Sequence, residues 1–162
     1  MNLKFYDLEE NIHTPDSKEE VEFRPGVYSF VRNKNDEILM IVDEASNQWE
    51  LPGGGLHVGE DLVEGVLREV KEETGYEANI NESDPFHIDK FMSYYSQIDK
   101  YSHQLNFYFS ATLESEKQQE QNFAEDENIL EVEFFDLDRL NELDIVHFQQ
   151  DAINKFLAQC QS

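Results

Sequence analysis

Three glutamates, Glu69, Glu72 and Glu73, lie close together in a segment whose apolar residues repeat with helical spacing. At about 100° per residue they fall within an arc of roughly 100°, so at least two pairs are neighbours on a helix surface. Like charges at this spacing destabilise a helix, and the same geometry turns Arg68 and Lys71 elsewhere. A hard divalent cation such as Mg²⁺ would convert the repulsion into coordination, because Mg²⁺ binds carboxylate oxygens together with phosphate oxygens and water. The alternative is a plain acidic helix face in a chain with 36 acidic residues.

The residues around these glutamates follow a longer pattern. Gly54 lies six residues before Glu60, and Glu60 lies eight before Arg68. The segment 54–76, GGLHVGEDLVEGVLREVKEETGY, resembles the Nudix box, G-x5-E-x7-R-E-U-x-E-E-x-G-U, in which U is a bulky aliphatic residue. Every fixed position of the pattern matches except the last, where Tyr76 stands in place of an aliphatic residue.

The resemblance implies a role for each matched residue. The metal ligands it implies are the side chains of Glu69, Glu72 and Glu73 and the main-chain carbonyl of Gly53, just before the box. Glu69 also matches the position that deprotonates or orients the attacking water. Arg68 and Glu60 match positions that pair with the carboxylates and hold the loop–helix–loop in shape.

The resemblance further implies a reaction, which is the Mg²⁺-dependent hydrolysis of a nucleoside diphosphate linked to a moiety X. Mn²⁺ is a possible substitute for Mg²⁺. Metal ions neutralise phosphate charge and lower the pKa of a bound water, which is most of what phosphoryl transfer requires. The expected substrate is a nucleoside triphosphate or a dinucleoside polyphosphate. Two alternatives stay open: an enzyme for ADP-ribose or another nucleotide sugar, and a non-catalytic nucleotide sensor.

Substrate contacts are expected outside the box. Arg24 and Arg32 flank the first buried strand and are candidates to contact a phosphate or a base. Aromatic residues that could stack on a base are Trp49, Tyr94, Tyr95, Tyr101 and Phe107, although each also suits a packing role. A distal carboxylate that acts as the base is sought among Glu125, Asp126 and Glu127, for which a solvated acidic loop is the alternative.

Composition restricts the partners. With 12 basic and 36 acidic residues the formal charge is −24, which repels nucleic-acid backbones and anionic membranes. A phosphorylated ligand therefore needs cations or locally placed Arg and Lys. The single cysteine cannot form an intrachain disulfide, and the sequence has no apolar run long enough to span a membrane. We expect a cytoplasmic protein with a small nucleotide as its partner; homodimerisation is left open.

The predicted elements form one α+β domain over residues 1–162. A hairpin of strands 27–31 and 38–42 precedes the glycines, and a helix covers 61–74. Further strands are predicted at 88–95, 105–113 and 132–135, and a final helix over 145–156. This order predicts an α/β/α sandwich, in which helices cover both faces of a mixed sheet. The resemblance implies the Nudix fold, with the loop–helix–loop after the second or third strand.

Overall fold

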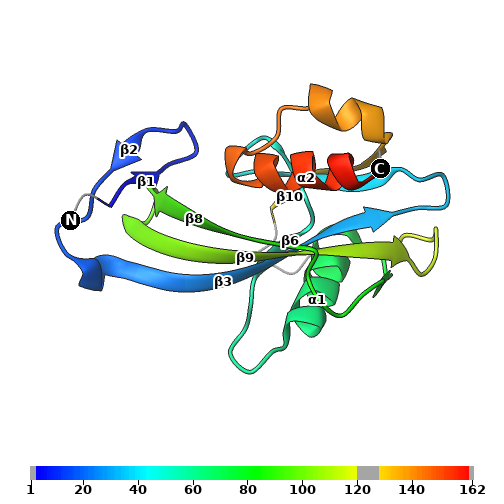
Figure 1. Cartoon of the computed structure of the whole chain (residues 1–162), viewed down its shortest axis with the longest axis horizontal. Helices are drawn as coiled ribbons and strands as arrows, with labels where there is room; N and C mark the ends of the chain where they lie inside the picture. The colour runs from blue at the N-terminus through cyan, green and yellow to red at the C-terminus, as the bar shows by residue number, and fades with distance from the viewer. Residues whose placement is uncertain (1–2, 120–127, 161–162) are drawn as a thin grey trace.

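A twisted mixed sheet with a helix on each face forms the centre of the protein (Figure 1). The computed structural model describes residues 3–119 and 128–160. The main path of the sheet runs β10-β4-β3-β9-β8-β1-β2, while β5, β6 and β7 pair with β4, β3 and β9. The strands are β1 (Phe5–Tyr6), β2 (Ile12–His13), β3 (Val21–Arg32), β4 (Ile38–Asp43), β5 (Trp49–Glu50), β6 (Gly53–Gly55), β7 (Ala78–Ile80), β8 (His87–Tyr95), β9 (Lys100–Leu113) and β10 (Ile129–Phe135). The predicted α+β class, with a central mixed sheet between helices, is confirmed.

Strands β3 and β4 form the predicted hairpin, closed by a turn at Asn33. The side-chain oxygen of Asn33 accepts hydrogen bonds from the amides of Asn35 and Glu37 at 2.9 and 3.0 Å. Such local side-chain bonds make Asn a turn former. Strand β3 begins at Val21, six residues before the predicted start, because it pairs in parallel with β9 along its whole length.

Helix α1 (Leu62–Thr74) confirms the predicted helix and is capped at both ends. The Asp61 carboxylate accepts a hydrogen bond from the Glu64 amide, and the Glu64 carboxylate accepts one from the Asp61 amide. This reciprocal capping box satisfies two amides that the first helical turn leaves unpaired. At the other end Gly75 adopts the left-handed conformation, with φ 72°. The apolar stripe of α1 buries Val66 against Phe109.

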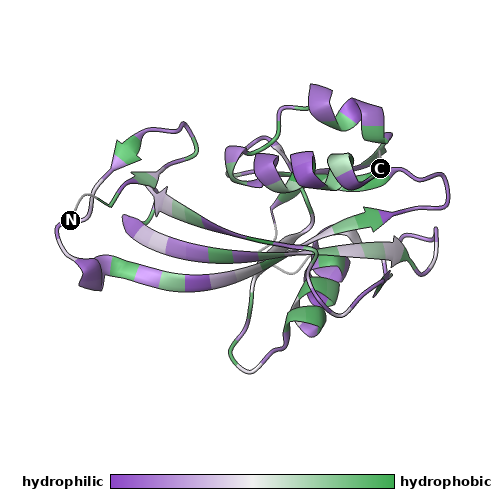
Figure 2. Cartoon of the chain, viewed as in Figure 1, coloured by the Kyte–Doolittle hydropathy of each residue, from purple (hydrophilic) through white to green (hydrophobic). Residues whose placement is uncertain are grey.

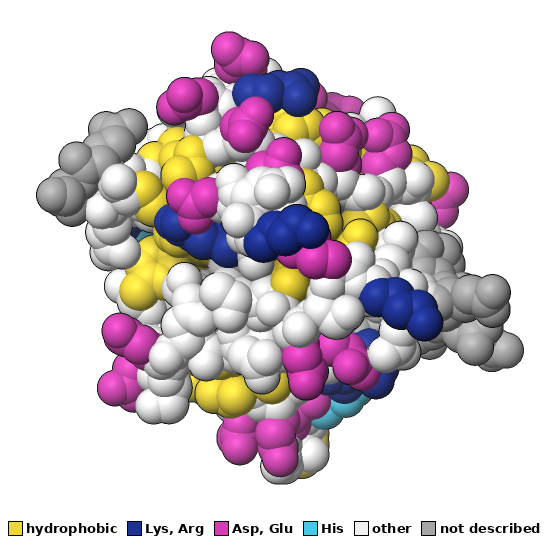
Figure 3. Space-filling model, turned by 90° about the vertical axis from the view of Figure 1, so that its right-hand side faces the viewer, with side chains coloured by type: hydrophobic (Ala, Val, Ile, Leu, Met, Phe, Trp, Pro, Cys, Tyr) yellow, Lys and Arg dark blue, Asp and Glu magenta, His cyan; other side chains and the backbone are white. Residues whose placement is uncertain are grey.

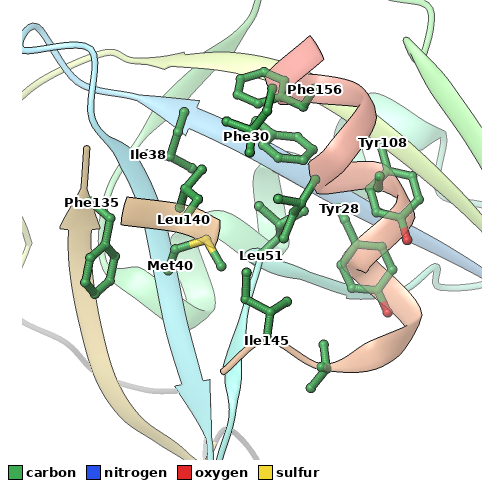
Figure 4. Packing of buried hydrophobic residues seen from close by; sticks show 14 residues of the cluster. Tyr28, Phe30, Ile38, Met40, Leu51, Tyr108, Phe135, Leu140, Ile145 and Phe156 are labelled. Atoms are coloured by element: carbon green, nitrogen blue, oxygen red, sulfur yellow. The ribbon is translucent and has the colours of Figure 1, made fainter. Parts of the chain in front are cut away.

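The larger core lies on the opposite face of the sheet, beneath α2 (Gln150–Cys160). The ring of Phe156 in α2 stacks on Phe30 of β3 at 4.0 Å between centroids (Figure 4). Figure 2 shows hydrophobic and hydrophilic residues mixed along both helices. The buried ones, such as Val70 in α1 and Ile153 in α2, belong to the core clusters. The 3-10 helices η2 (Leu137–Glu142) and η3 (His147–Gln149) join β10 to α2. The prediction that the last helix starts at residue 145 is wrong, because Ile145 forms a bridge with Trp49 that keeps this stretch extended.

The surface carries the acidic excess. On the face shown in Figure 3, Asp and Glu side chains are spread widely and Lys and Arg side chains lie singly among them. None of the helices in the described residues is long and apolar enough to cross a membrane.

We expect Asp61→Ala to lower the free energy of unfolding by about 1 kcal/mol, because it leaves the Glu64 amide without its cap. Asp61→Asn is the matched control, since asparagine caps as well as aspartate. Urea denaturation of the three proteins measures the difference. Equal stability of the alanine and asparagine variants would contradict the importance of the cap.

Candidate active site

Strand β6 consists of three glycines and lies against α1. The amide of Gly53 donates a 2.8 Å hydrogen bond to Oε2 of Glu73. A Cβ atom on Gly54 would lie 2.9 Å from Oε1 of Glu69, so that carboxylate packs directly on the main chain. Both glutamates are only 6% exposed. Glycine in β6 therefore allows two buried acids of the helix to reach the strand.

Gly53 cannot be replaced by a larger residue without moving the strand. Its φ of 152° is one that side chains rarely adopt, and a Cβ atom would lie 2.1 Å from the carbonyl oxygen of Val27 in β3. The chain thus requires glycine here to bring β6 alongside β3.

Arg68 lies among the carboxylates. Its Nε and Nη2 atoms donate to the two oxygens of Glu60 at 2.7 and 3.0 Å, and Nη2 also donates to the Gly55 carbonyl at 3.1 Å. Its Nη1 atom lies 2.9 Å from both Glu69 and Glu72. The prediction that helical geometry turns Arg68 elsewhere is wrong, because the guanidinium reaches residues one helical turn away and the preceding loop. One cation thus offsets much of the like-charge repulsion expected within the cluster.

Glu60 holds the loop that precedes α1. Hydrogen bonds from Arg68 are the main reason why its pKa falls to about 2, and the amide of His57 donates another at 3.0 Å. The loop rests on the helix at Gly65, where a Cβ atom would lie 2.4 Å from the Leu56 side chain. The structure therefore brings Glu60, Arg68 and the helix together as the resemblance implies.

The donor chemistry of this cluster fits a hard divalent cation. Glu69, Glu72 and Glu73 offer carboxylate oxygens from one helix, and the main chain of Gly53 lies beside them, where its amide bonds to Glu73. Within residues 3–119 and 128–160, no three acidic, histidine or cysteine side chains converge as a ready-made metal site. Arg68 instead lies between Glu69 and Glu72, so binding a cation would require these carboxylates to change partners.

A cavity of about 270 Å³ adjoins β6. Gly54 lines this cavity as well as contacting Glu69, so the main chain of β6 is shared between the cavity and the acidic cluster. Aromatic rings form much of the remaining wall. Tyr28 lines it and stacks on Tyr108 at 5.5 Å, and Phe91 and Phe148 lie 5.6 Å apart. Flat aromatic walls suit a planar base.

Glu50 places a carboxyl group in the cavity wall. Its Oε1 atom accepts a 2.6 Å hydrogen bond from the Ser46 hydroxyl, and both residues line the cavity. Burial raises the pKa of Glu50 to about 7; the Ser46 hydrogen bond opposes this shift and the negative charge of Asp43 adds to it. No Lys or Arg in the described part of the chain forms an ion pair with Glu50.

Three of the predicted substrate contacts line the cavity, Arg24, Tyr94 and Tyr95. The Arg24 guanidinium lies over Gly55, where a Cβ atom would come within 2.7 Å of Nη2. The Tyr94 hydroxyl donates to Asp99 at 2.9 Å. All three residues stay candidates to contact a substrate.

The structure does not bring Arg32 or Trp49 to the cavity lining. Arg32 is at the far end of β3, where it pairs with Asp36 and lies 5.2 Å from the centre of the Phe156 ring. Trp49 packs edge-on against Phe135 in the core at 4.7 Å. Glu125, Asp126 and Glu127 lie outside the described residues.

Sequence reasoning missed Glu50, Tyr28 and Phe148 as cavity residues. Glu50 had a usable signal, because it lies three residues before the glycine strand. Tyr28 reads as an ordinary member of a buried strand. Phe148 has no local signal, because only the packing of the C-terminal segment brings it to the cavity.

Comparison with known proteins finds one family that matches most of the chain. The family model described as NUDIX domain matches residues 22–156. A putative 8-oxo-dGTP diphosphatase of Bacillus subtilis (strain 168) is 36% identical over 59 residues, which are 36% of this chain and 40% of the relative. An RNA pyrophosphohydrolase of Acinetobacter baylyi is 38% identical over 53 residues, 33% of this chain and 32% of that protein. The matched segments thus span less than half of each relative.

The fold comparison extends further along the chain. The crystal structure of a MutT protein from Methanosarcina mazei Go1 superposes with a TM-score of 0.62, covering 88% of this chain and 99% of the other. At 21% sequence identity, this likeness concerns the fold.

We expect Glu50→Gln to stabilise the protein more at pH 8 than at pH 5.5. The folded-state pKa of about 7 lies above the ordinary 4.5, so the folded protein holds more protons between these values and its stability falls as the pH rises. The variant removes this loss, which is at most about 3 kcal/mol. Urea denaturation in the presence of a chelator measures the difference in unfolding free energy between wild type and variant at each pH. Both pH values lie above the sequence pI of 4.3. If the difference in unfolding free energy between wild type and variant is the same at both pH values, the expected upward shift of the Glu50 pKa is contradicted.

Proposed function

The chain belongs to the Nudix family, and from that premise we propose that it hydrolyses a nucleoside diphosphate linked to a moiety X, with Mg²⁺ or Mn²⁺ as the cofactor. The products would be a nucleoside monophosphate and phosphorylated X. The observation that carries the proposal is the position of β6, whose glycines contact the buried Glu69 and Glu73 and also line the aromatic cavity.

The different surroundings on the two sides of β6 suggest where each part of the substrate would bind. The aromatic cavity would take the nucleoside, and the diphosphate would extend across the glycines to the acidic face of α1. Arg24 lies over Gly55 and would donate hydrogen bonds to a phosphate. A cavity of about 270 Å³ is at the lower end for small-molecule sites, which favours a single nucleoside. We therefore propose a nucleoside triphosphate ahead of a dinucleoside polyphosphate.

The chain's own residues would prepare the reaction. When bound, divalent cations would neutralise the phosphate charge and lower the pKa of a bound water. Glu69, Glu72, Glu73 and the Gly53 carbonyl would hold them. Glu69 would also orient the attacking water or accept its proton. Arg68 would keep Glu69 and Glu72 in place, and Glu60 would fix Arg68.

That residues 1–162 form one domain stays a prediction.

A substrate panel tests the proposed function. The purified chain is incubated with Mg²⁺ and, separately, a deoxynucleoside triphosphate, a dinucleoside tetraphosphate or ADP-ribose, and chromatography identifies the products. We expect the deoxynucleoside triphosphate to yield a monophosphate and pyrophosphate, with the highest kcat/KM of the panel. A higher value for ADP-ribose would establish the nucleotide-sugar alternative. Binding without hydrolysis of any member, with Mg²⁺ and then Mn²⁺, would establish a sensor and overturn the enzyme.

We expect substitutions of the α1 glutamates to have two kinds of effect, one on metal binding and one on turnover. We expect Glu72→Gln and Glu73→Gln to weaken Mg²⁺ binding and to lose activity that excess metal partly restores. Glu69→Gln should lower kcat by about 10²–10⁴-fold, the usual contribution of a general base, and added metal should restore little.

Glu64→Gln is the matched control on the same helix, because glutamine preserves the capping box. Steady-state kinetics over a Mg²⁺ titration distinguish the two classes. Near-normal turnover of Glu69→Gln would place the base elsewhere, and residues 125–127 would then be the next to replace.

A further inference from the structure

We propose that Glu50 reads the base of the substrate and selects an edge that presents two adjacent N–H donors, as guanine does. This inference rests on the proposed function and adds a specificity residue to it. Glu50 is in β5, three residues before the glycine strand, and its carboxyl group lies in the wall of the aromatic cavity.

The partners of Glu50 leave acceptor capacity for a ligand. Ser46 donates to Oε1, and no other hydrogen bond to the Glu50 carboxyl group occurs within the described ranges. An ionised carboxylate has about four acceptor positions on its two oxygens. Buried acids usually pair with a cation, yet Asp43 is the charged neighbour that acts most strongly on Glu50 and it has the same sign. Packing alone does not explain a carboxyl group kept in this setting.

Other polar groups of the cavity are less suited to reading the base. The Gln104 amide nitrogen already donates to Ser93 and to Tyr95. Arg24 lies over Gly55 at the side of the cavity that adjoins the phosphate path. His147 also lines the cavity, and its buried Nε2 has no hydrogen-bond partner among the described side chains. It could complement a carbonyl. The other carboxylates of the lining are already engaged, because Asp7 accepts from the Asn11 amide and lies 2.8 Å from His13, and Asp43 accepts from the Ala45 amide.

Base chemistry then determines the preference. At pH 8 and above the Glu50 carboxyl group is mostly ionised and offers only acceptors, and the guanine edge presents a ring N–H beside an amino group. Adenine and cytosine present one donor beside a ring acceptor, and uracil and thymine present one donor between two carbonyls. Tyr28 and Phe91 line the same cavity and offer rings on which the base can stack while Glu50 contacts its edge.

The test compares dGTP with dITP, which differs only in lacking the 2-amino group. We expect wild type to favour dGTP in kcat/KM by about 10–100-fold, the usual effect of leaving a charged acceptor without its donor. In the Glu50→Gln variant an amide NH₂ group replaces one of the two carboxylate oxygens. The ratio of kcat/KM for dGTP to that for dITP should therefore fall to near one. Glu44→Gln is the matched control, because Glu44 is exposed and does not line the cavity. It should keep the wild-type ratio.

Calorimetry measures the binding affinity for dGDP and for dIDP, so this outcome does not depend on turnover. Preferential binding of dGDP that Glu50→Gln abolishes supports the assignment, even if no nucleotide is hydrolysed and the proposed function fails. Hydrolysis without a guanine preference, or a preference that Glu50→Gln retains, overturns the role of Glu50 and leaves the proposed function standing. Failure to bind either nucleotide overturns the role of Glu50, and the substrate panel then decides the proposed function separately.

Discussion

The ion pairs of Arg68 with Glu60, Glu69 and Glu72 are the interaction on which the arrangement of the site depends. Three acids so close together would repel one another, and Glu69 is nearly buried. A single guanidinium satisfies carboxylates from the helix and from the preceding loop, because its donors project in several directions of one plane. Its bond to the Gly55 carbonyl joins the glycine strand to the same network. Loop, helix and strand are thereby held in one arrangement.

The second constraint is that strand β6 consists of glycines and has no side chains. Larger residues would collide with Val27 at position 53 and with Glu69 at position 54. The absence of side chains lets the strand lie between an acidic helix and an aromatic cavity while contacting both. The substrate that we propose has a flat base at one end and a charged diphosphate at the other, and these two parts require such different surroundings at a short separation.

Glu50 shows how stability and recognition can oppose each other within one cavity. Its partly buried carboxyl group has Ser46 as a hydrogen-bond donor and the like charge of Asp43 nearby, so ionisation weakens the folded state. The same lack of partners leaves acceptors available to a ligand. In a chain of charge −24, a further acid in the wall of a cavity adds to the repulsion of any anionic ligand, and recognition of a base is the physical reason that we propose for it.

Much of this protein follows from local sequence. The period of residues 61–74, the cap at Asp61 and the glycine at position 75 determine helix α1, because these signals act within a few residues. The spacing from Gly54 to Glu73 identified the acidic cluster for the same reason. Tertiary structure decided where Arg68 points, because its partners include Glu60 in a loop that folds back over the helix. It also decided the cavity, since Glu50, Phe91 and Phe148 come from distant segments, and it kept Ile145 extended through its bridge to Trp49. Contacts between residues so far apart depend on how the sheet closes, which no local pattern of residue types records.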